Sequence, residues 1–300
     1  MEEMFAQCLT LLPNWGHLAL LSLAVLCLLA AALLPFPVFF GLVCGQRGRK
    51  GMHERCAGQL GGLACLLGWI CLICLAISLV WCTFVRPQMQ DMPTLIRYSL
   101  NYGAAILALG LVPVSLARLF REGLRQKTVL HVLLWLAAGL VLVCMLFVGL
   151  LGGLVFVQDS VEFGQCPMDA VNTHFMVTFV LLLAFGLAAA GCLGLIWLLL
   201  RRNIDDYGRD YYGFAAKWCA RWAAVGGWAA AAVGVLLGIA SDSPGTGAVG
   251  MGFFLVPLLA ASIVWTTVSA SSMPMRHKIG MVACIFLLAL SLAGAGMSFV

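Results

Sequence analysis

The long uncharged runs in this sequence limit its fold more than any other feature does. The run from Phe175 to Leu200, for example, contains no Asp, Glu, Lys or Arg. A helix needs about 20 apolar residues to cross the hydrocarbon core of a bilayer. The chain is 63% hydrophobic and 10% charged, whereas a soluble domain carries about 25% charged residues. The sequence therefore predicts a protein whose solvent is lipid.

Continuous runs of this length predict an all-α, polytopic membrane protein. Lipid supplies no hydrogen bonds, so only helices and closed barrels satisfy the backbone there, and barrel strands alternate apolar and polar residues. Residues 1–15 contain two glutamates and no Lys or Arg. They lack the basic start of a cleavable signal peptide, so we expect the first apolar segment to be a retained helix.

About eight segments are long enough to span the membrane, and we expect them to form one transmembrane domain over residues 1–300. Pro35 and Pro37 interrupt the first segment, where we expect a kink or an early end followed by a re-oriented turn. The layout is compatible with two parallel four-helix repeats, 1–157 and 158–300. The predicted helices are 17–43, 57–85, 98–117, 129–157, 171–200, 219–240, 248–270 and 279–299.

Small residues inside the spans predict packing contacts. Gly58, Gly61, Gly62 and Gly68 suit close approach of helices. Cys71 and Cys74 form a CxxC pair, but the pair lies within a predicted span and no histidine follows it. It therefore lacks the attachment signature of a c-type haem, and we interpret both cysteines as small apolar residues.

The basic residues predict the orientation of the chain. Of 17 Lys and Arg residues, all except Arg86 and Arg97 lie on alternate connections between the predicted helices. Basic connections face the cytoplasm, so an even number of helices places both termini outside it, in the cell (inner) membrane. The basic connection 201–218 also holds three tyrosines, and we expect it to be an interfacial loop. This distribution explains the net charge of +5 without a nucleic-acid partner.

Histidines near span ends are the main candidates for chemistry, because no acid or base falls in the middle of any predicted helix. We assign His53 and His277 to solvent in basic loops and expect a capping or interfacial role for His131. His17 and His174 each lie just inside the outer end of a helix, in one leaflet and at similar depth. Imidazole is a common axial ligand of haem iron, and bundles hold cofactors between facing helices.

Met251, at the outer start of the seventh predicted helix, is a third candidate, because a thioether is a known second axial ligand of haem. The alternative for Met251 is a gap-filling side chain. The alternative for the two histidines is hydrogen bonding to water or carbonyl groups at the interface. Whether His17 and His174 share one iron or bind two stays open at this point.

The layout resembles subunit I of the cytochrome bd quinol oxidases. The likeness lies in His174, the apolar run that ends at Leu198-Leu199-Leu200-Arg201-Arg202, and the Ala-rich sixth helix. The resemblance implies haem b, with His17 binding one haem and His174 and Met251 binding another. It also implies contact with quinone.

Departures from that family narrow the implied activity. The third predicted helix has no carboxylate, the connection between helices six and seven is the short 241–247, and a ninth helix is missing. The resemblance thus implies a reduced, bd-like cytochrome b that passes electrons, and gives no support for terminal oxidase activity. Arg86 and Arg97, the two outer-side arginines, could bind haem propionates, since Arg suits bidentate pairing with carboxylates. They could equally be ordinary loop residues.

Three functions follow from these observations. The first is a haem b electron-transfer subunit between the quinone pool and an outer-face partner, such as another membrane subunit or a c-type cytochrome. The second is a haem-free, eight-helix quinol-interacting anchor similar to the polysulfide-reductase type, which has no need of His17 and His174. The third is a small-molecule transporter, for which broken helices with polar clusters are the expected sign.

Overall fold

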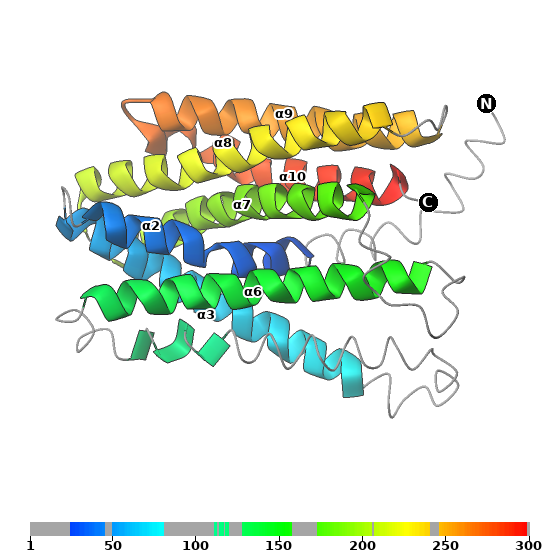
Figure 1. Cartoon of the computed structure of the whole chain (residues 1–300). Coiled ribbons are helices and arrows are strands. Elements are labelled where there is room, and N and C mark those ends of the chain that lie inside the picture. Colours follow the sequence, from blue (N-terminus) through cyan, green and yellow to red (C-terminus); the bar gives the residue numbers. More distant parts are fainter. Residues whose placement is uncertain are drawn as a thin grey trace.

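The computed structural model describes residues 25–45, 50–80, 111–112, 114–116, 118–119, 128–157, 173–205, 207–240 and 246–298. These residues are helical apart from short turns, and they contain no strand (Figure 1). The elements are α2 (Pro35–Gly45), α3 (Lys50–Val80), α6 (Thr128–Val157), α7 (Thr173–Arg201), α8 (Arg209–Ala240), α9 (Thr246–Ala270), the 3-10 helix η4 (Pro274–His277) and α10 (Lys278–Ser298).

Seven helical segments in the described part are long and apolar enough to cross a membrane. They run from Val25 to Gly45 and then follow α3, α6, α7, α8, α9 and, from Pro274 on, α10. The all-α, polytopic fold class is therefore confirmed. The predicted helix 98–117 lies mostly outside the described residues. The division into two repeats stays a prediction.

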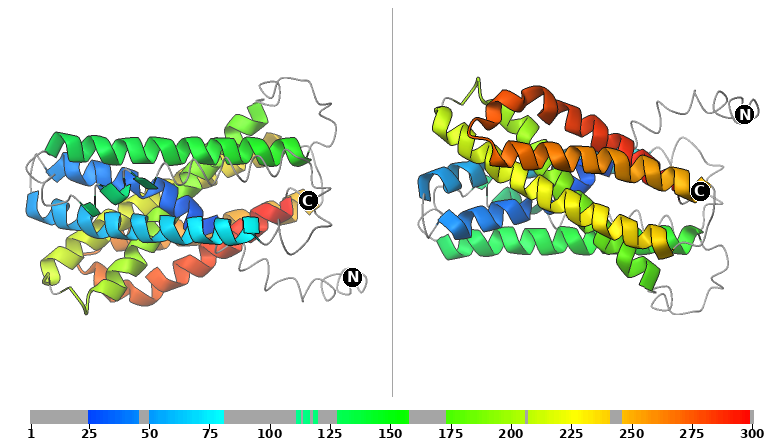
Figure 2. Two further views of the ribbon diagram at one scale, coloured as in Figure 1. Left: turned by 90° about the horizontal axis from the view of Figure 1, so that it is seen from below. Right: turned by 90° about the horizontal axis from the view of Figure 1, so that it is seen from above.

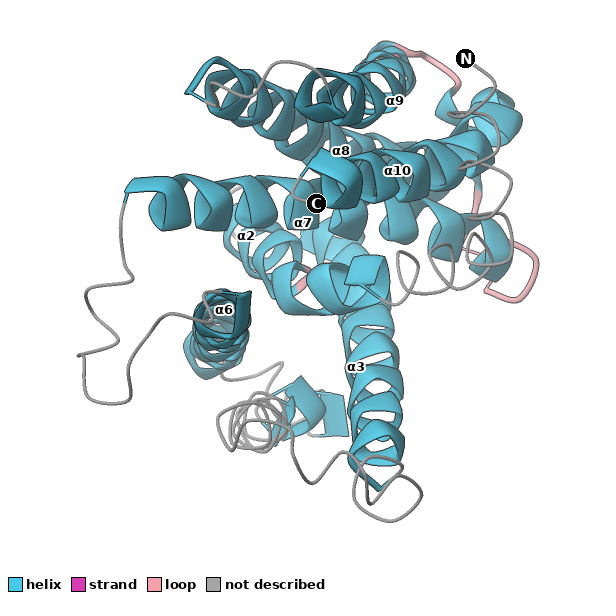
Figure 3. Ribbon diagram, turned by 90° about the vertical axis from the view of Figure 1, so that its right-hand side faces the viewer, coloured by secondary structure: helices cyan, strands magenta, loops and turns pink. Residues whose placement is uncertain are grey.

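The last four helices form a bundle of their own. Helix α7 packs against α8, α8 against α9, and α9 against α10. A smaller contact between α10 and α7 closes the bundle. Helix α2 packs on both α3 and α6. Seen from one end, α7 to α10 gather on one side of the molecule while α3 and α6 extend from the other (Figure 3). Contacts of α3 and α6 with α7, and of α3 with α8, join the two groups.

The first helix is interrupted at the prolines, as predicted. Residues 25–33 are helical, Leu34 is a turn, and α2 begins at Pro35. The backbone hydrogen bonds from Leu34 N to Ala30 O (2.8 Å) and from Val38 N to Leu34 O (3.3 Å) continue across the break. Because Pro35 and Pro37 lack a donor, the helical hydrogen-bond pattern is interrupted there, while the residues on both sides stay helical.

Helices α7 and α8 are in backbone contact because glycine lies at their closest points. A Cβ atom at Gly191 would lie 2.6 Å from the Cys219 carbonyl oxygen, and one at Gly226 would lie 2.7 Å from the Ala184 carbonyl oxygen. Residues with real side chains could not approach so closely. Small residues allow this kind of packing where lipid removes the hydrophobic driving force between helices.

Gly61, Gly62 and Gly68 of α3 also meet neighbouring side chains, as the packing role predicted for them requires. A Cβ at Gly61 would lie 2.6 Å from Cζ2 of Trp135, and one at Gly68 would lie 3.4 Å from Cγ of Leu111. Gly62 faces Arg118, whose Nη1 donates to the Gly62 carbonyl oxygen at 3.1 Å. The glycines thus position α3 against α6 and against the helical residues 111–119 that the structure describes.

The prediction of an interfacial loop over 201–218 was wrong. Helix α8 begins at Arg209, ten residues before the predicted start, directly after Gly208, which has a φ of +84°. Tyr211 and Tyr212 are 2% and 3% exposed. The segment is helical because its tyrosine rings pack inward while their hydroxyls find partners within the protein, as described below.

Helix ends that carry basic residues gather at one end of the bundle. Figures 1 and 2 show the ends of α2, α7 and α9 and the starts of α3, α6, α8 and α10 at this end, with the C terminus at the other. We call it the basic end; its described basic residues include Arg55, Arg118, Arg201, Arg209 and Lys278. Which side of the membrane the basic end faces stays a prediction.

The close contact between α7 and α8 can be tested with Gly226→Ala. The added methyl group meets the backbone of α7, so we expect a loss of about 1–3 kcal/mol of stability, although alanine favours a helix by about 1 kcal/mol. Gly213→Ala, in the same helix but with open space around it, is the control and should not destabilise. Thermal unfolding in detergent measures both. Equal stability of the two variants would contradict the contact.

Candidate functional site

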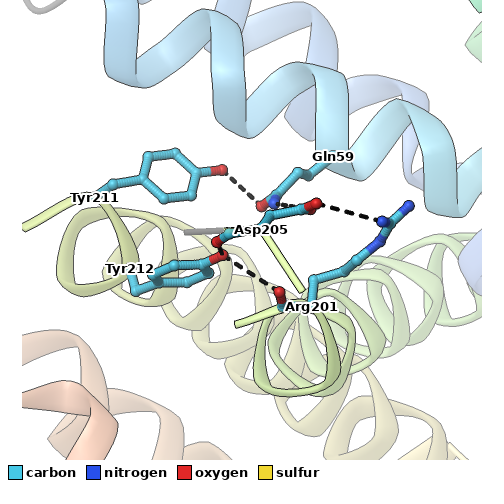
Figure 4. A network of polar contacts seen from close by, with 5 residues as sticks. All are labelled: Gln59, Arg201, Asp205, Tyr211 and Tyr212. Atoms are coloured by element: carbon cyan, nitrogen blue, oxygen red, sulfur yellow. Dashed lines mark hydrogen bonds and ion pairs between the residues drawn. The ribbon is translucent and has the colours of Figure 1, made fainter. Parts of the chain in front are cut away.

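Polar side chains converge at the basic end, between α3 and the turn that joins α7 to α8 (Figure 4). Gln59 of α3 is the hub and is 9% exposed. Its Nε2 donates to Oδ2 of Asp205 at 3.0 Å, and its Oε1 accepts from the Tyr211 hydroxyl at 2.7 Å. Arg201 Nη1 pairs with the other oxygen of Asp205 at 3.5 Å. We call these residues, together with Tyr212, the Gln59 network.

Tyr212 closes the C-terminal end of α7. Its hydroxyl donates to the Asp205 carbonyl oxygen and lies 3.4 Å from the Arg201 carbonyl oxygen. The last carbonyl groups of a helix have no partner within that helix. The buried Tyr212 hydroxyl supplies a hydrogen-bond donor here. The tight turn after α7 can therefore pack against the interior.

The Gln59 network fits a structural clamp better than a catalytic centre. The Gln59 amide donates a hydrogen bond to the Asp205 carboxylate. The described contacts include no nucleophile paired with a base. A buried polar network in which every member is satisfied stiffens the structure around it. It ties α3 to the α7–α8 turn, and so joins the two groups of helices.

His53 lies in an aromatic cluster, and its assignment to solvent was wrong. Helix α3 begins at Lys50, so His53 is helical and half-buried. Its ring meets Phe214 and Trp218 of α8 edge-on, with ring centroids 4.7 and 5.3 Å apart. Its Nδ1 is buried without a hydrogen-bond partner. The early start of α8 carries these aromatic residues to α3, which the expected loop would not have done.

His131 has a structural partner. Nε1 of Trp135, one turn along α6, donates to Nε2 of His131 at 3.1 Å. The interaction follows from helical spacing of four residues. His277, in contrast, is exposed, as predicted, and lies 3.3 Å from the Ser271 hydroxyl.

Few polar side chains are buried in the part of the chain that the structure describes. They are Gln59, Ser262 and Ser291. Ser262 donates to the Leu258 carbonyl oxygen at 2.8 Å and Ser291 to the Phe254 carbonyl oxygen at 2.7 Å. Both serine hydroxyls therefore bond backbone carbonyl groups. The described interior carries no buried Asp, Glu, Lys or Arg.

The predicted ligand residues fall largely outside what the structure describes. His17, Arg86 and Arg97 lie outside the described residues. His174 belongs to the first turn of α7, but only its backbone is described. Met251 is described and half-buried; its Cγ would lie 3.4 Å from a Cβ at Gly238 of α8. Packing of Met251 against Gly238 is the gap-filling role that the sequence left open.

Contacts with α8 relate α7 to α9. A Cβ at Gly226 would meet the backbone of α7 at Ala184, and one at Gly227, the next residue of α8, would meet Ser262 of α9. Phe185 of α7 and Phe254 of α9 also meet in the bundle interior, with ring centroids 6.2 Å apart. These contacts do not separate the start of α7 from Met251 along the bundle, and whether His174 and Met251 share an iron stays a prediction.

No group of three or more His, Cys, Asp or Glu side chains that could hold a metal ion occurs among the described residues. The thiols of Cys56 and Cys219 are both buried where α3 meets α8. They contribute to packing near the Gln59 network. No third side chain of these types joins the two thiols among the described residues.

Comparison with protein-family models, with curated proteins and with solved structures gives no match. The resemblance to cytochrome bd subunit I therefore stays an expectation from the sequence.

Sequence analysis missed the Gln59 network, although one signal for it was present. Gln59 is a polar residue inside a predicted span, and a polar group in a span needs a partner. The partners, Asp205 and Tyr211, are 146 and 152 positions away in the chain. Only the tertiary structure could identify them.

Replacement of Gln59 tests the clamp. Gln59→Leu leaves the buried Tyr211 hydroxyl and the Asp205 carboxylate without their partner, so we expect a loss of about 1–3 kcal/mol. Tyr211→Phe combined with Gln59→Leu removes both ends of one hydrogen bond and should cost less than the two single changes added together. Thermal unfolding of the four proteins in detergent measures this coupling.

Tyr207→Phe is the matched control for this cycle, because Tyr207 is 40% exposed. It should change stability by less than about 0.5 kcal/mol. Strictly additive effects of Gln59→Leu and Tyr211→Phe would contradict the clamp.

Proposed function

We propose that this chain is a membrane electron-transfer subunit that carries haem b between His17 and His174 and passes electrons between the quinone pool and an outer-face partner. When bound, haem b supplies reversible one-electron chemistry. The proposal rests on the sequence candidates together with a register relation between the first helix and α7.

The relation is the close contact of α7 with the first helix. A Cβ at Gly186 would lie 3.4 Å from the Leu29 carbonyl oxygen and 3.1 Å from Cγ of Leu33. His174 precedes Gly186 by twelve positions, and His17 precedes Leu29 by twelve positions. The two helices run in the same direction. A helical rise of about 1.5 Å per residue over both segments would carry both imidazoles about 18 Å outward from this contact.

Equal spacing from one contact favours a single iron with two histidine ligands. The family resemblance implies a His174–Met251 pair instead, and the equal spacing of the two histidines from the Gly186 contact is the reason to prefer His17 as the partner of His174. In the proposed arrangement Met251 packs against Gly238 and holds α9 to α8. The first turn of α7 also lies against α6, since the buried Phe175 ring meets Phe147 edge-on at 5.1 Å.

The uncharged interior supports electron transfer over proton-coupled chemistry. Reduction of dioxygen at a buried centre needs a route for protons, and intramembrane acids commonly supply one. In the described helices the buried polar side chains, aromatic residues aside, are an amide and two hydroxyls that already have partners. This favours a conduit for electrons and argues against a terminal oxidase.

The clustering of basic helix ends supports the proposed orientation. With the basic end in the cytoplasm, the start of α7 and the C terminus face outward. Electrons would then leave or enter at the outer face. A haem at that face exchanges electrons with a partner, for which a c-type cytochrome or another membrane subunit is suited.

Removal of the two histidines tests the haem. We expect the purified wild-type protein to show b-type absorbance in a pyridine haemochrome assay. His17→Ala and His174→Ala should each lose the low-spin spectrum, because each removes one axial ligand. Met251→Leu should keep it, and His277→Ala, a change at an exposed histidine of the basic end, is the control.

The same assay distinguishes the competing functions. Retention of the spectrum in His174→Ala, or its loss in Met251→Leu alone, would overturn the ligand pair. A folded, iron-free protein that binds a quinone analogue would replace the proposal with the haem-free anchor. Substrate uptake by proteoliposomes of iron-free protein would favour the transporter.

Reporter fusions test the orientation separately. A C-terminal alkaline phosphatase fusion should be active and a C-terminal green fluorescent protein fusion dark, because we place that terminus outside the cytoplasm. Fusions truncated after Asn203, at the basic end, should show the reverse pattern. The opposite result at both positions would invert the topology.

A further inference from the structure

Helix α8 is longer than a membrane is thick, and this fixes the depth of its residues. It has 32 residues, which corresponds to a length of about 48 Å at 1.5 Å per residue. The hydrocarbon core is about 30 Å thick. If the outer end of α8 lies at the outer surface of the hydrocarbon core, about 20 residues cross the core and about twelve extend beyond it at the basic end. The boundary then falls near Arg221.

The outer surface of α8 changes character at that position. Arg221 is exposed. From there toward Ala240 the exposed side chains are apolar, and they include Val225, Trp228, Leu236 and Ile239, which are 60%, 46%, 63% and 75% exposed. This stripe faces lipid. Lys217 and Arg221 therefore lie at its cytoplasmic limit, at the level of the headgroups.

Lys217 and Arg221 are a pair of like charges on one helix face. Residues four apart are neighbours on a helix, and like charges at this spacing repel. Among the described residues neither side chain has a hydrogen bond or an ion pair. Asp205, an acid at the same end, is already paired with Arg201 at 3.5 Å. Two adjacent cations without an acid between them favour an anion from outside the protein.

Tryptophans mark the same depth independently. Trp218 and Trp222 flank the two cations on α8 and meet each other edge-on, with centroids 6.1 Å apart. Trp222 also meets Phe40 of α2 at 5.3 Å, and Phe40 is 42% exposed. Tryptophan concentrates at the headgroup level of membranes. The aromatic cluster thus forms a rigid wall beside the cations.

We propose that Lys217 and Arg221 bind the phosphate of an anionic phospholipid, with the lipid's acyl chains along the Val225–Trp228 surface. The guanidinium of Arg221 can contact two phosphate oxygens, and the ammonium of Lys217 adds a point charge. The continuous apolar surface beyond Arg221 is the reason to choose a lipid over free phosphate, because it matches an acyl chain and offers nothing to a soluble anion.

The test uses the full chain in nanodiscs of mixed phosphatidylglycerol and phosphatidylcholine. Native mass spectrometry of the released protein measures the ratio of the two lipids retained. We expect wild type to retain phosphatidylglycerol preferentially. Lys217→Gln combined with Arg221→Gln should lower that preference by roughly 30-fold, from the usual contribution of two basic residues near an anionic surface. Each single variant should lower it by about fivefold.

Arg276→Gln combined with Lys278→Gln is the matched control. It removes the same charge from exposed residues at the same end, in a segment whose helix η4 contacts α8, but it leaves Lys217 and Arg221 in place, so it should lower the preference much less than the Lys217→Gln/Arg221→Gln change does. The swap Lys217→Arg combined with Arg221→Lys keeps both charges and should retain the wild-type preference for phosphatidylglycerol.

Three results would overturn the proposal. The first is wild-type preference in the Lys217→Gln/Arg221→Gln protein, and the second is an equal loss in the control. The third is displacement of the retained lipid by soluble glycerol phosphate, which would show a phosphate site without a role for the lipid chains. The single variants give the same answer if the double variant does not purify.

Discussion

Lipid offers no hydrogen bonds to a buried polar group, and this constraint organises the whole molecule. The described interior is built from apolar and small residues, and its buried serine and glutamine side chains each have a partner. Ser262 and Ser291 return their hydroxyls to helix carbonyl groups, and Gln59 meets Tyr211 and Asp205. Because the interior cannot carry unpaired charge, basic residues and aromatic clusters concentrate at the helix ends.

Packing between helices depends on complementary shapes, because moving apolar surface from lipid onto another helix contributes little free energy. The contact of α7 with α8 shows how this is achieved. Gly191 and Gly226 bring the two backbones together, and the alternative of large side chains would separate them. Gly186 does the same for α7 and the first helix. That second contact matters for the proposed function, because it fixes the relative depth of Leu29 and Gly186, from which the proposed haem ligands are placed.

The basic end and the opposite end have different roles in this account. At the basic end the Gln59 network holds α3 to the α7–α8 turn, and the α8 surface with Lys217 and Arg221 faces the lipid headgroups. The proposed haem lies at the opposite end, where α7 begins. Structural stiffness at the basic end suits the proposed electron transfer, which needs no large conformational change.

The sequence by itself determined the solvent, the helical class, most of the spans, the break at Pro35 and the packing role of the α3 glycines. These features are local: the length of an uncharged run, a missing backbone donor or a missing side chain is enough to predict each one. The tertiary structure decided what depends on distant partners. It showed that Tyr211 and Tyr212 are buried in a helix rather than placed in a loop, because Gln59 and the end of α7 supply their hydrogen bonds. It also packed the His53 ring of α3 against Phe214 and Trp218 of α8, a contact that no spacing along the chain reveals.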